Sequence, residues 1–107
     1  TLALPTQFGT LAEALKQLGY ENHAVGKWHL GMFAPDVLPT SRGFASFFGF
    51  HGGSEDYFSH DAIESSVSSQ PYFDLFDESG SVPTPAPGYA GRYSTLIYAE
   101  RAVAIIE

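Results

Sequence analysis

The absences in this sequence narrow its function before any motif is read. Its 107 residues contain no cysteine, so neither a disulfide nor a thiolate metal site can form among them. Only 5 lysines and arginines face 12 acidic residues, and the formal net charge is −7. A nucleic acid is therefore a poor partner, because its phosphates require a basic surface. No apolar run is long enough to span a membrane.

What the sequence does contain is typical of a globular protein. Hydrophobic residues make up 44% and aromatic residues 15%, which is enough apolar material for a core. The length fits one small domain or a piece of a larger one. The chain begins with Thr1 rather than Met, and its last helical pattern reaches Glu107 without a glycine, a proline or a basic last turn. We therefore expect an internal fragment of a longer protein.

The clearest local signal is a helix that begins after Thr10. Glu13 lies three residues further on, so the two residues can form a capping box, and Gly19 is well placed to end the helix in a left-handed conformation. Apolar residues fall on one face at helical spacing, namely Leu11, Ala14, Leu15 and Leu18. Residues 23–26 then suit a short buried strand, and this order predicts the α/β class.

The rest of the chain carries weaker signals. Residues 39–41 predict a short helical turn that continues through residues 42–49. Residues 62–92 hold most of the prolines and many serines, and they predict a long loop with one short strand near residues 72–76. A final helix starts at residues 94–95, and its apolar stripe is formed by Leu96, Ala99, Val103 and Ile106.

Lys27 and His29 follow the predicted strand, at the place where the active groups of α/β sheets collect. In an extended backbone these two side chains point to the same side, and Trp28 points the other way into packing. A lysine supplies a fixed positive charge and an imidazole carries a proton near neutral pH, so the pair suits an oxyanion site. From the spacing alone, a solvated strand end is the more common explanation of such a pair.

Three stretches of the sequence, the first of which contains Lys27 and His29, resemble the sulfatase family of the alkaline-phosphatase-like superfamily, most closely the arylsulfatase B type. They are "GKWHLG" at 26–31, "PTSRGFASFFG" at 39–49 and "GSEDYFSH" at 53–60. The resemblance runs from about residue 10 to residue 107 and is weakest across 62–92. It implies that residues 1–107 are part of a sulfatase N-terminal domain, incomplete at both ends, with an alkaline-phosphatase-like α/β fold.

The resemblance implies a sulfuric ester hydrolase. Members of the family use a formylglycine, made by the formylglycine-generating enzyme from a Cys or Ser in a C/S-x-P-x-R motif, and a Ca²⁺ ion held by Asp and Asn residues. Lys27 matches the motif lysine that contacts the sulfate group and the formylglycine. His29 matches the motif histidine that hydrogen-bonds the formylglycine and helps to remove its proton. The implied substrate is a sulfated sugar or an aryl sulfate, and the implied compartment is lysosomal, secreted or periplasmic.

The sequence also departs from the family pattern. It has no cysteine and no C/S-x-P-x-R motif, and no residue matches the family's calcium-binding Asp residues. Calcium and formylglycine are therefore expected outside this segment, and we expect the 107 residues alone to be inactive. Two alternatives stay open, which are a phosphoesterase or phosphonate hydrolase of the same superfamily and a non-catalytic sulfatase-like paralogue.

Other polar residues are better explained without a catalytic role. Residues 59–61 (SHD) cannot easily form a triad, because neighbouring side chains diverge along an extended chain. A solvated loop is favoured there, although a serine in a similar stretch touches substrate in some arylsulfatases. The acidic pair 55–56 is expected on a wet surface. His23 is interpreted as structural, and His51 has no visible partner. The aromatic residues of 44–50 are expected in the core.

Overall fold

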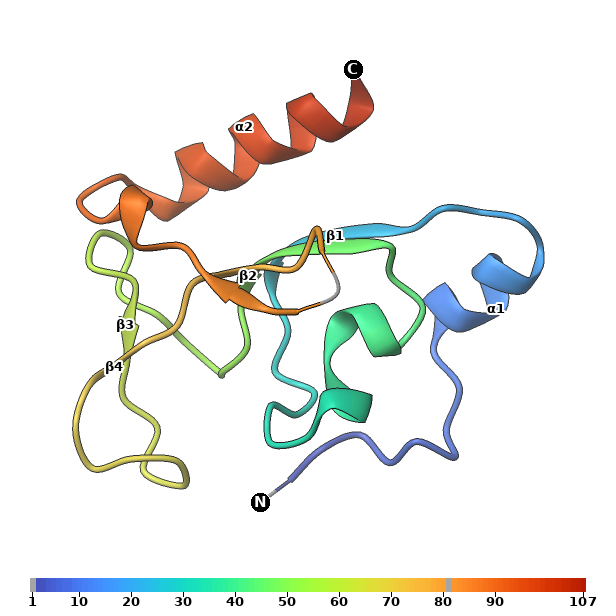
Figure 1. Cartoon of the computed structure of the whole chain (residues 1–107). Coiled ribbons are helices and arrows are strands. Elements are labelled where there is room, and N and C mark those ends of the chain that lie inside the picture. The colour runs from blue at the N-terminus through green and yellow to red at the C-terminus, as the bar shows by residue number, and fades with distance from the viewer. Residues whose placement is uncertain (1, 81) are drawn as a thin grey trace.

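A computed structural model describes residues 2–80 and 82–107 and contains two helices, two small sheets and three 3-10 turns. Figure 1 shows α2 on one side of the strands, with the N-terminal segment and the turns of residues 35–41 on the other. Along the chain the elements are α1 Leu11–Gln17, β1 His23–Lys27, 3-10 turns Pro35–Val37 and Pro39–Ser41, β2 Ser46–Phe50, β3 Asp61–Ala62, β4 Tyr72–Phe73, β5 Phe76–Asp77, β6 Thr84–Pro85, a 3-10 turn Pro87–Tyr89, and α2 Ser94–Ile106. Neither described helix is both long and apolar enough to cross a bilayer.

The main sheet has the order β1-β2-β5-β6 and mixes parallel with antiparallel pairs. β1 runs parallel to β2, with Lys27 opposite Phe50, while β5 and β6 are added in antiparallel order. The parallel pair brings the carboxyl ends of β1 and β2 to one edge, where the segments after Lys27 and Phe50 lie side by side. The predicted α/β class is confirmed.

The first helix forms as its sequence predicts at both ends, but most of its apolar stripe is exposed. Thr10 and Glu13 form the predicted capping box, and Gly19 follows the helix with a φ of +90°. Leu11 and Leu18, however, are each 75% exposed. Ala14 is exposed as well, and only Leu15 of the stripe is half-buried.

Contact between α1 and the rest of the fold runs instead through Ala12, which is buried. The helix backbone lies so close to Gly43 that a Cβ there would come within 2.4 Å of the Glu13 nitrogen. Asn22 joins the two segments by donating from Nδ2 to the carbonyl oxygens of Ala12 and Gly43. The helix is therefore held by close packing of its backbone against Gly43 and by the hydrogen bonds of Asn22. Hydrophobic periodicity predicts neither of these contacts.

The predicted continuation of a helical turn through residues 42–49 is wrong. The 3-10 turn ends at Ser41, and Ser46–Phe50 forms the central strand β2. Phe47 and Phe48 point to opposite faces of the sheet and both are buried. A strand covered on both faces reads as a continuous apolar run, which periodicity alone does not separate from a helix. The expected burial of the aromatic residues of 44–50 is confirmed for Phe47 and Phe48, whereas Phe44 and Phe50 are half-buried.

The core lies between the sheet and α2, and α2 uses a different face from the predicted one. Phe48, Leu75 and Ile97 form a buried cluster. The predicted stripe points away from it, since Leu96, Val103 and Ile106 are exposed. The helix is docked partly by a cation, because the Arg101 guanidinium lies 4.1 Å from the centre of the Phe48 ring.

The single strand predicted near residues 72–76 is two short strands in two sheets. β4 pairs with β3, and β5 pairs with β2. Between them Asp74 and Leu75 are fully buried. The break occurs where the Asp74 carboxylate takes up backbone N–H groups from the loop that follows β2.

Candidate functional site

Lys27 and His29 lie where β1 ends, at the edge of the sheet that was expected to carry chemistry. Both residues are exposed. Pairing with the neighbouring segment continues for two residues past the strand, because the amides of Trp28 and His29 donate to the carbonyl oxygens of Phe50 and His51 at 3.0 Å. His29 then turns away with a φ of +54°, a left-handed conformation that is uncommon outside glycine.

That turn changes the geometry on which the pairing of Lys27 with His29 was predicted. Alternation of side chains holds only while the backbone is extended, and His29 has left that conformation. Trp28 nevertheless packs inward as expected. Its Nε1 donates to the Val37 carbonyl oxygen at 3.0 Å, and its ring meets Phe44 edge-on at 5.9 Å.

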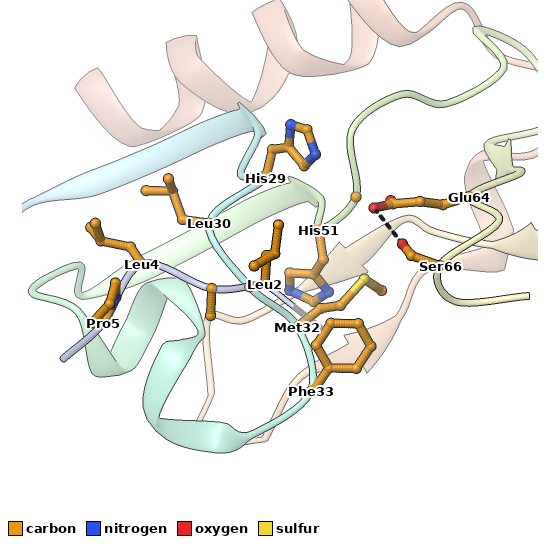
Figure 2. Close-up of a pocket in the computed structure, with 13 residues that line it drawn as sticks. Leu2, Leu4, Pro5, His29, Leu30, Met32, Phe33, His51, Glu64 and Ser66 are labelled. Atoms are coloured by element: carbon orange, nitrogen blue, oxygen red, sulfur yellow. Dashed lines mark hydrogen bonds between the residues drawn. The ribbon is translucent and has the colours of Figure 1, made fainter.

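His29 borders a cavity of about 510 Å³, shown in Figure 2. Glu64 and Ser66 lie across this cavity from Leu30, and Met32 and Phe33 close another side. The remaining wall comes from the N-terminal segment, which is tied in place by the Leu4 amide donating to the Leu30 carbonyl oxygen. Its lining is Leu2, Ala3, Leu4, Pro5, His29, Leu30, Gly31, Met32, Phe33, His51, Gly52, Glu64 and Ser66. Lys27 is not part of this described lining.

His51 and Gly52 also line the cavity, and they belong to the segment 51–53, whose three consecutive amides donate to carboxylates. The His51 and Gly52 nitrogens donate to the two oxygens of Asp74 at 2.9 and 2.8 Å. The Gly53 nitrogen donates to Glu64 Oε2 at 3.3 Å. Asp74 is 0% exposed, and a buried carboxylate that accepts two backbone N–H groups fixes that backbone firmly.

His51 has a partner that the sequence did not reveal. Its Nε2 lies 2.5 Å from Glu78 Oε2, and its ring stacks on Phe47 at 5.4 Å. Glu78 is fully buried and also accepts a hydrogen bond from Thr40 Oγ1. The pair holds the end of β2 against β5, and its partners are far apart in sequence, so no local signal could have found it.

The interpretation of residues 59–61 as a solvated loop is wrong for His60, which is 0% exposed. Its Nε2 donates to the Tyr89 carbonyl oxygen at 3.0 Å. Its Nδ1 lies 3.2 Å from Glu55 Oε2 and 3.3 Å from Ser94 Oγ. Ser94 is buried and donates to the Tyr57 carbonyl oxygen, so this arrangement joins α2 to the loop and is closed to substrate.

Glu55 is likewise not a wet surface residue, because its side chain is 1% exposed. It accepts a hydrogen bond from the Tyr98 hydroxyl. Burial, and next the hydrogen bond to Glu55, raise the pKa of Tyr98, which therefore stays protonated. Asp56 caps the following turn by accepting from the Ser59 and Phe58 amides, which lowers the pKa of Asp56. His23 is structural as interpreted, bound to Ser46 and Glu21.

No metal centre is formed by the described part of the chain, where His, Asp and Glu nowhere gather in a group of three or more that could hold an ion. The candidate site is therefore an exposed lysine and a histidine that opens on a largely apolar cavity. A lysine can hold an anion, and an imidazole can move a proton.

Comparison with known proteins gives this geometry its context. The family model described as Sulfatase matches residues 3–106. Arylsulfatase J of Mus musculus is 40% identical over 104 residues, which cover 96% of this chain and 16% of that protein. Arylsulfatase of Klebsiella aerogenes is 45% identical over 62 residues, covering 58% of this chain and 13% of the relative. The chain thus spans less than a fifth of the length of these relatives.

A solved structure agrees with the fold. The crystal structure of Ps i-CgsB superposes with a TM-score of 0.72 at 24% identity, over 98% of this chain and 24% of that one. A mixed α/β arrangement with the same path therefore occurs within a larger protein.

Proposed function

The chain belongs to the sulfatase family, and from this membership we propose that it forms part of a longer enzyme that hydrolyses sulfate esters, called the parent enzyme below. The observation that carries the proposal is the match to the Sulfatase family from residue 3 to residue 106. Within that match, Lys27 and His29 of "GKWHLG" stand exposed at the carboxyl end of β1, which is where α/β sheets present their reactive groups.

Lys27 is proposed to bind the sulfate group. Its side chain is exposed and forms no ion pair within the described residues, so its charge is available to an anion. Negative charge grows on the departing bridging oxygen as the sulfur–oxygen bond breaks. A cation already in place stabilises that change without reorganisation.

His29 is proposed to move a proton during turnover. Its backbone is fixed by the hydrogen bond to His51, and its ring borders the cavity in which we place the alcohol part of the substrate. A positioned proton carrier contributes on the order of 10²–10⁴-fold to rate. The largely apolar walls suit one face of a sugar ring or an aryl group.

Calcium and formylglycine, which the family implies, do not fit the residues of this chain. The sequence has no cysteine and no C/S-x-P-x-R motif, and the described residues form no metal-binding group. We place both on other parts of the parent enzyme and assign no step through them here. We further propose a parent that is lysosomal, secreted or periplasmic, and that is modified by the formylglycine-generating enzyme.

The test uses Lys27→Ala and His29→Ala in the parent enzyme, with turnover of an aryl sulfate as the assay. We expect kcat/KM to fall on the order of 10²-fold or more in each, while Lys16→Ala on the exposed side of α1 leaves it unchanged. Near-normal rates in both variants would remove these residues from the mechanism. Preference for an aryl phosphate over the sulfate would instead favour the phosphoesterase alternative.

A further inference from the structure

We propose that Gly53 is a positioning residue for the His29 imidazole, and that a side chain at position 53 disables this ring without unfolding the protein. The proposal rests on the proposed function, because it concerns the orientation of the group that is expected to carry the proton. Gly53 does not touch the reacting atoms, and it acts only through the space that it leaves open.

The contact between the two residues is direct. A Cβ built on Gly53 would lie 2.9 Å from Nε2 of His29, 3.0 Å from Cε1 and 3.4 Å from Cδ2. These are the atoms at the outer edge of the ring, so the imidazole rests against the Gly53 backbone with the edge that bears Nε2. Even the methyl group of alanine would occupy space that this edge now fills.

The ring, and not the backbone, must yield to such a methyl group. His29 is held at its own nitrogen by His51. On the other side, Gly53 donates to Glu64 Oε2, and the preceding amides donate to the fully buried Asp74. Rotation of the imidazole about its side-chain torsions is the movement that leaves all of these hydrogen bonds intact.

At two other glycines, an added side chain would disturb the fold itself rather than the His29 ring. A Cβ on Gly52 would meet Glu64 Oε2 at 2.9 Å and Asp74 Oδ2 at 3.0 Å, which are the carboxylates that hold the segment. A Cβ on Gly49 would lie 1.9 Å from the Gly26 carbonyl oxygen. In these two positions a side chain disturbs the support of the fold, whereas at position 53 it meets the mobile end of the proposed proton carrier.

The experiment compares Gly53→Ala with Gly88→Ala in the parent enzyme, because a Cβ at position 88 meets nothing within 4 Å. For Gly53→Ala we expect kcat for an aryl sulfate to fall tenfold or more with little change in KM, and Tm to stay within about 2 °C of the original. Gly88→Ala changes neither. A crystal structure of Gly53→Ala is expected to show the His29 ring rotated away, a result that does not depend on activity.

The double variant Gly53→Ala/His29→Ala separates this proposal from a general effect on the site. If Gly53 acts through the ring, adding Gly53→Ala to His29→Ala lowers kcat no further. An equal fold-loss in both backgrounds, an unmoved ring, or unfolding of Gly53→Ala overturns the proposal. If His29→Ala alone is near normal, the role proposed for His29 in the proposed function fails, while the rotated ring in the crystal still decides whether Gly53 positions His29.

Discussion

Arg42 joins the N-terminal segment to α1, and its replacement tests how far burial strengthens an ion pair in this fold. The guanidinium is 2% exposed. Its Nε donates to Glu13 Oε1 at 2.9 Å, and its terminal nitrogens donate to the carbonyl oxygens of Leu4 at 3.0 Å and Phe8 at 2.6 Å. Leu4 lines the cavity next to His29, so loosening this anchor also loosens a wall of the candidate site.

The loss of stability in Arg42→Met follows from the groups that lose their partner, because methionine keeps the apolar stem but removes every hydrogen-bond donor. Removing one partner of a buried ion pair costs about 3–5 kcal/mol. Glu13 is 32% exposed, so water reaches part of the stranded carboxylate, and we lower the expectation to about 2–4 kcal/mol. The matched control is Arg92→Met. Its pair with Glu100 is 48% and 61% exposed, and it is expected to cost about 0–1 kcal/mol.

Amide hydrogen exchange in the parent enzyme measures this loss where it occurs. Local opening sets the exchange rate, so about 2–4 kcal/mol corresponds to exchange roughly 30- to 10³-fold faster across residues 4–19. Arg92→Met should change that segment by less than about fivefold. If Arg42→Met accelerates exchange no more than Arg92→Met does, burial does not strengthen the Arg42 contacts and the reasoning is refuted.

Two further predictions concern the chain by itself and its response to acid. The isolated 107 residues should neither hydrolyse an aryl sulfate nor bind Ca²⁺ in calorimetry, and should melt broadly because apolar helix faces are uncovered; clear turnover or a sharp monomeric melt would contradict this. Burial alone would raise the pKa of Asp77, but hydrogen bonds from Arg101 and Ser79 lower it overall. The stability from this depressed pKa is present above the unfolded pKa and is lost as pH falls towards the folded one, so Asp77→Asn should reduce the acid sensitivity of parent-enzyme unfolding by less than about 1 kcal/mol. An unchanged pH profile would rule that contribution out.

The parts of the fold that were predictable from sequence are those with a local cause. The capping box of Thr10 and Glu13 involves two residues one helical turn apart, and Gly19 ends the same helix. Both features depend only on residues that are close together in the sequence. The helix faces were not predictable in the same way, because periodicity shows that a stripe exists but not whether anything covers it. Leu11 and Leu96 belong to such stripes, and both are exposed.

The support of the candidate site lay beyond sequence reasoning. The "GKWHLG" motif singles out Lys27 and His29, whose roles in the parent enzyme stay predictions. What fixes the surroundings is a set of buried carboxylates, Asp74 and Glu78, whose partners stand 23 and 27 residues earlier. Isolated acidic residues in a loop-rich segment are ordinarily solvated. Only the folded chain shows that these two hold the end of β2.

This remote support of His29 has a consequence for the order in which the protein is made. When the motif leaves the ribosome, β2 and the carboxylate of Asp74 have not yet emerged behind it. The histidine must therefore wait in a flexible nascent chain until more than forty further residues emerge, about the distance from position 29 to position 74. Pairing with residues 50 and 51 holds its left-handed backbone, and Asp74 in turn holds the amide of His51, so the support of His29 is complete only after residue 74 has emerged.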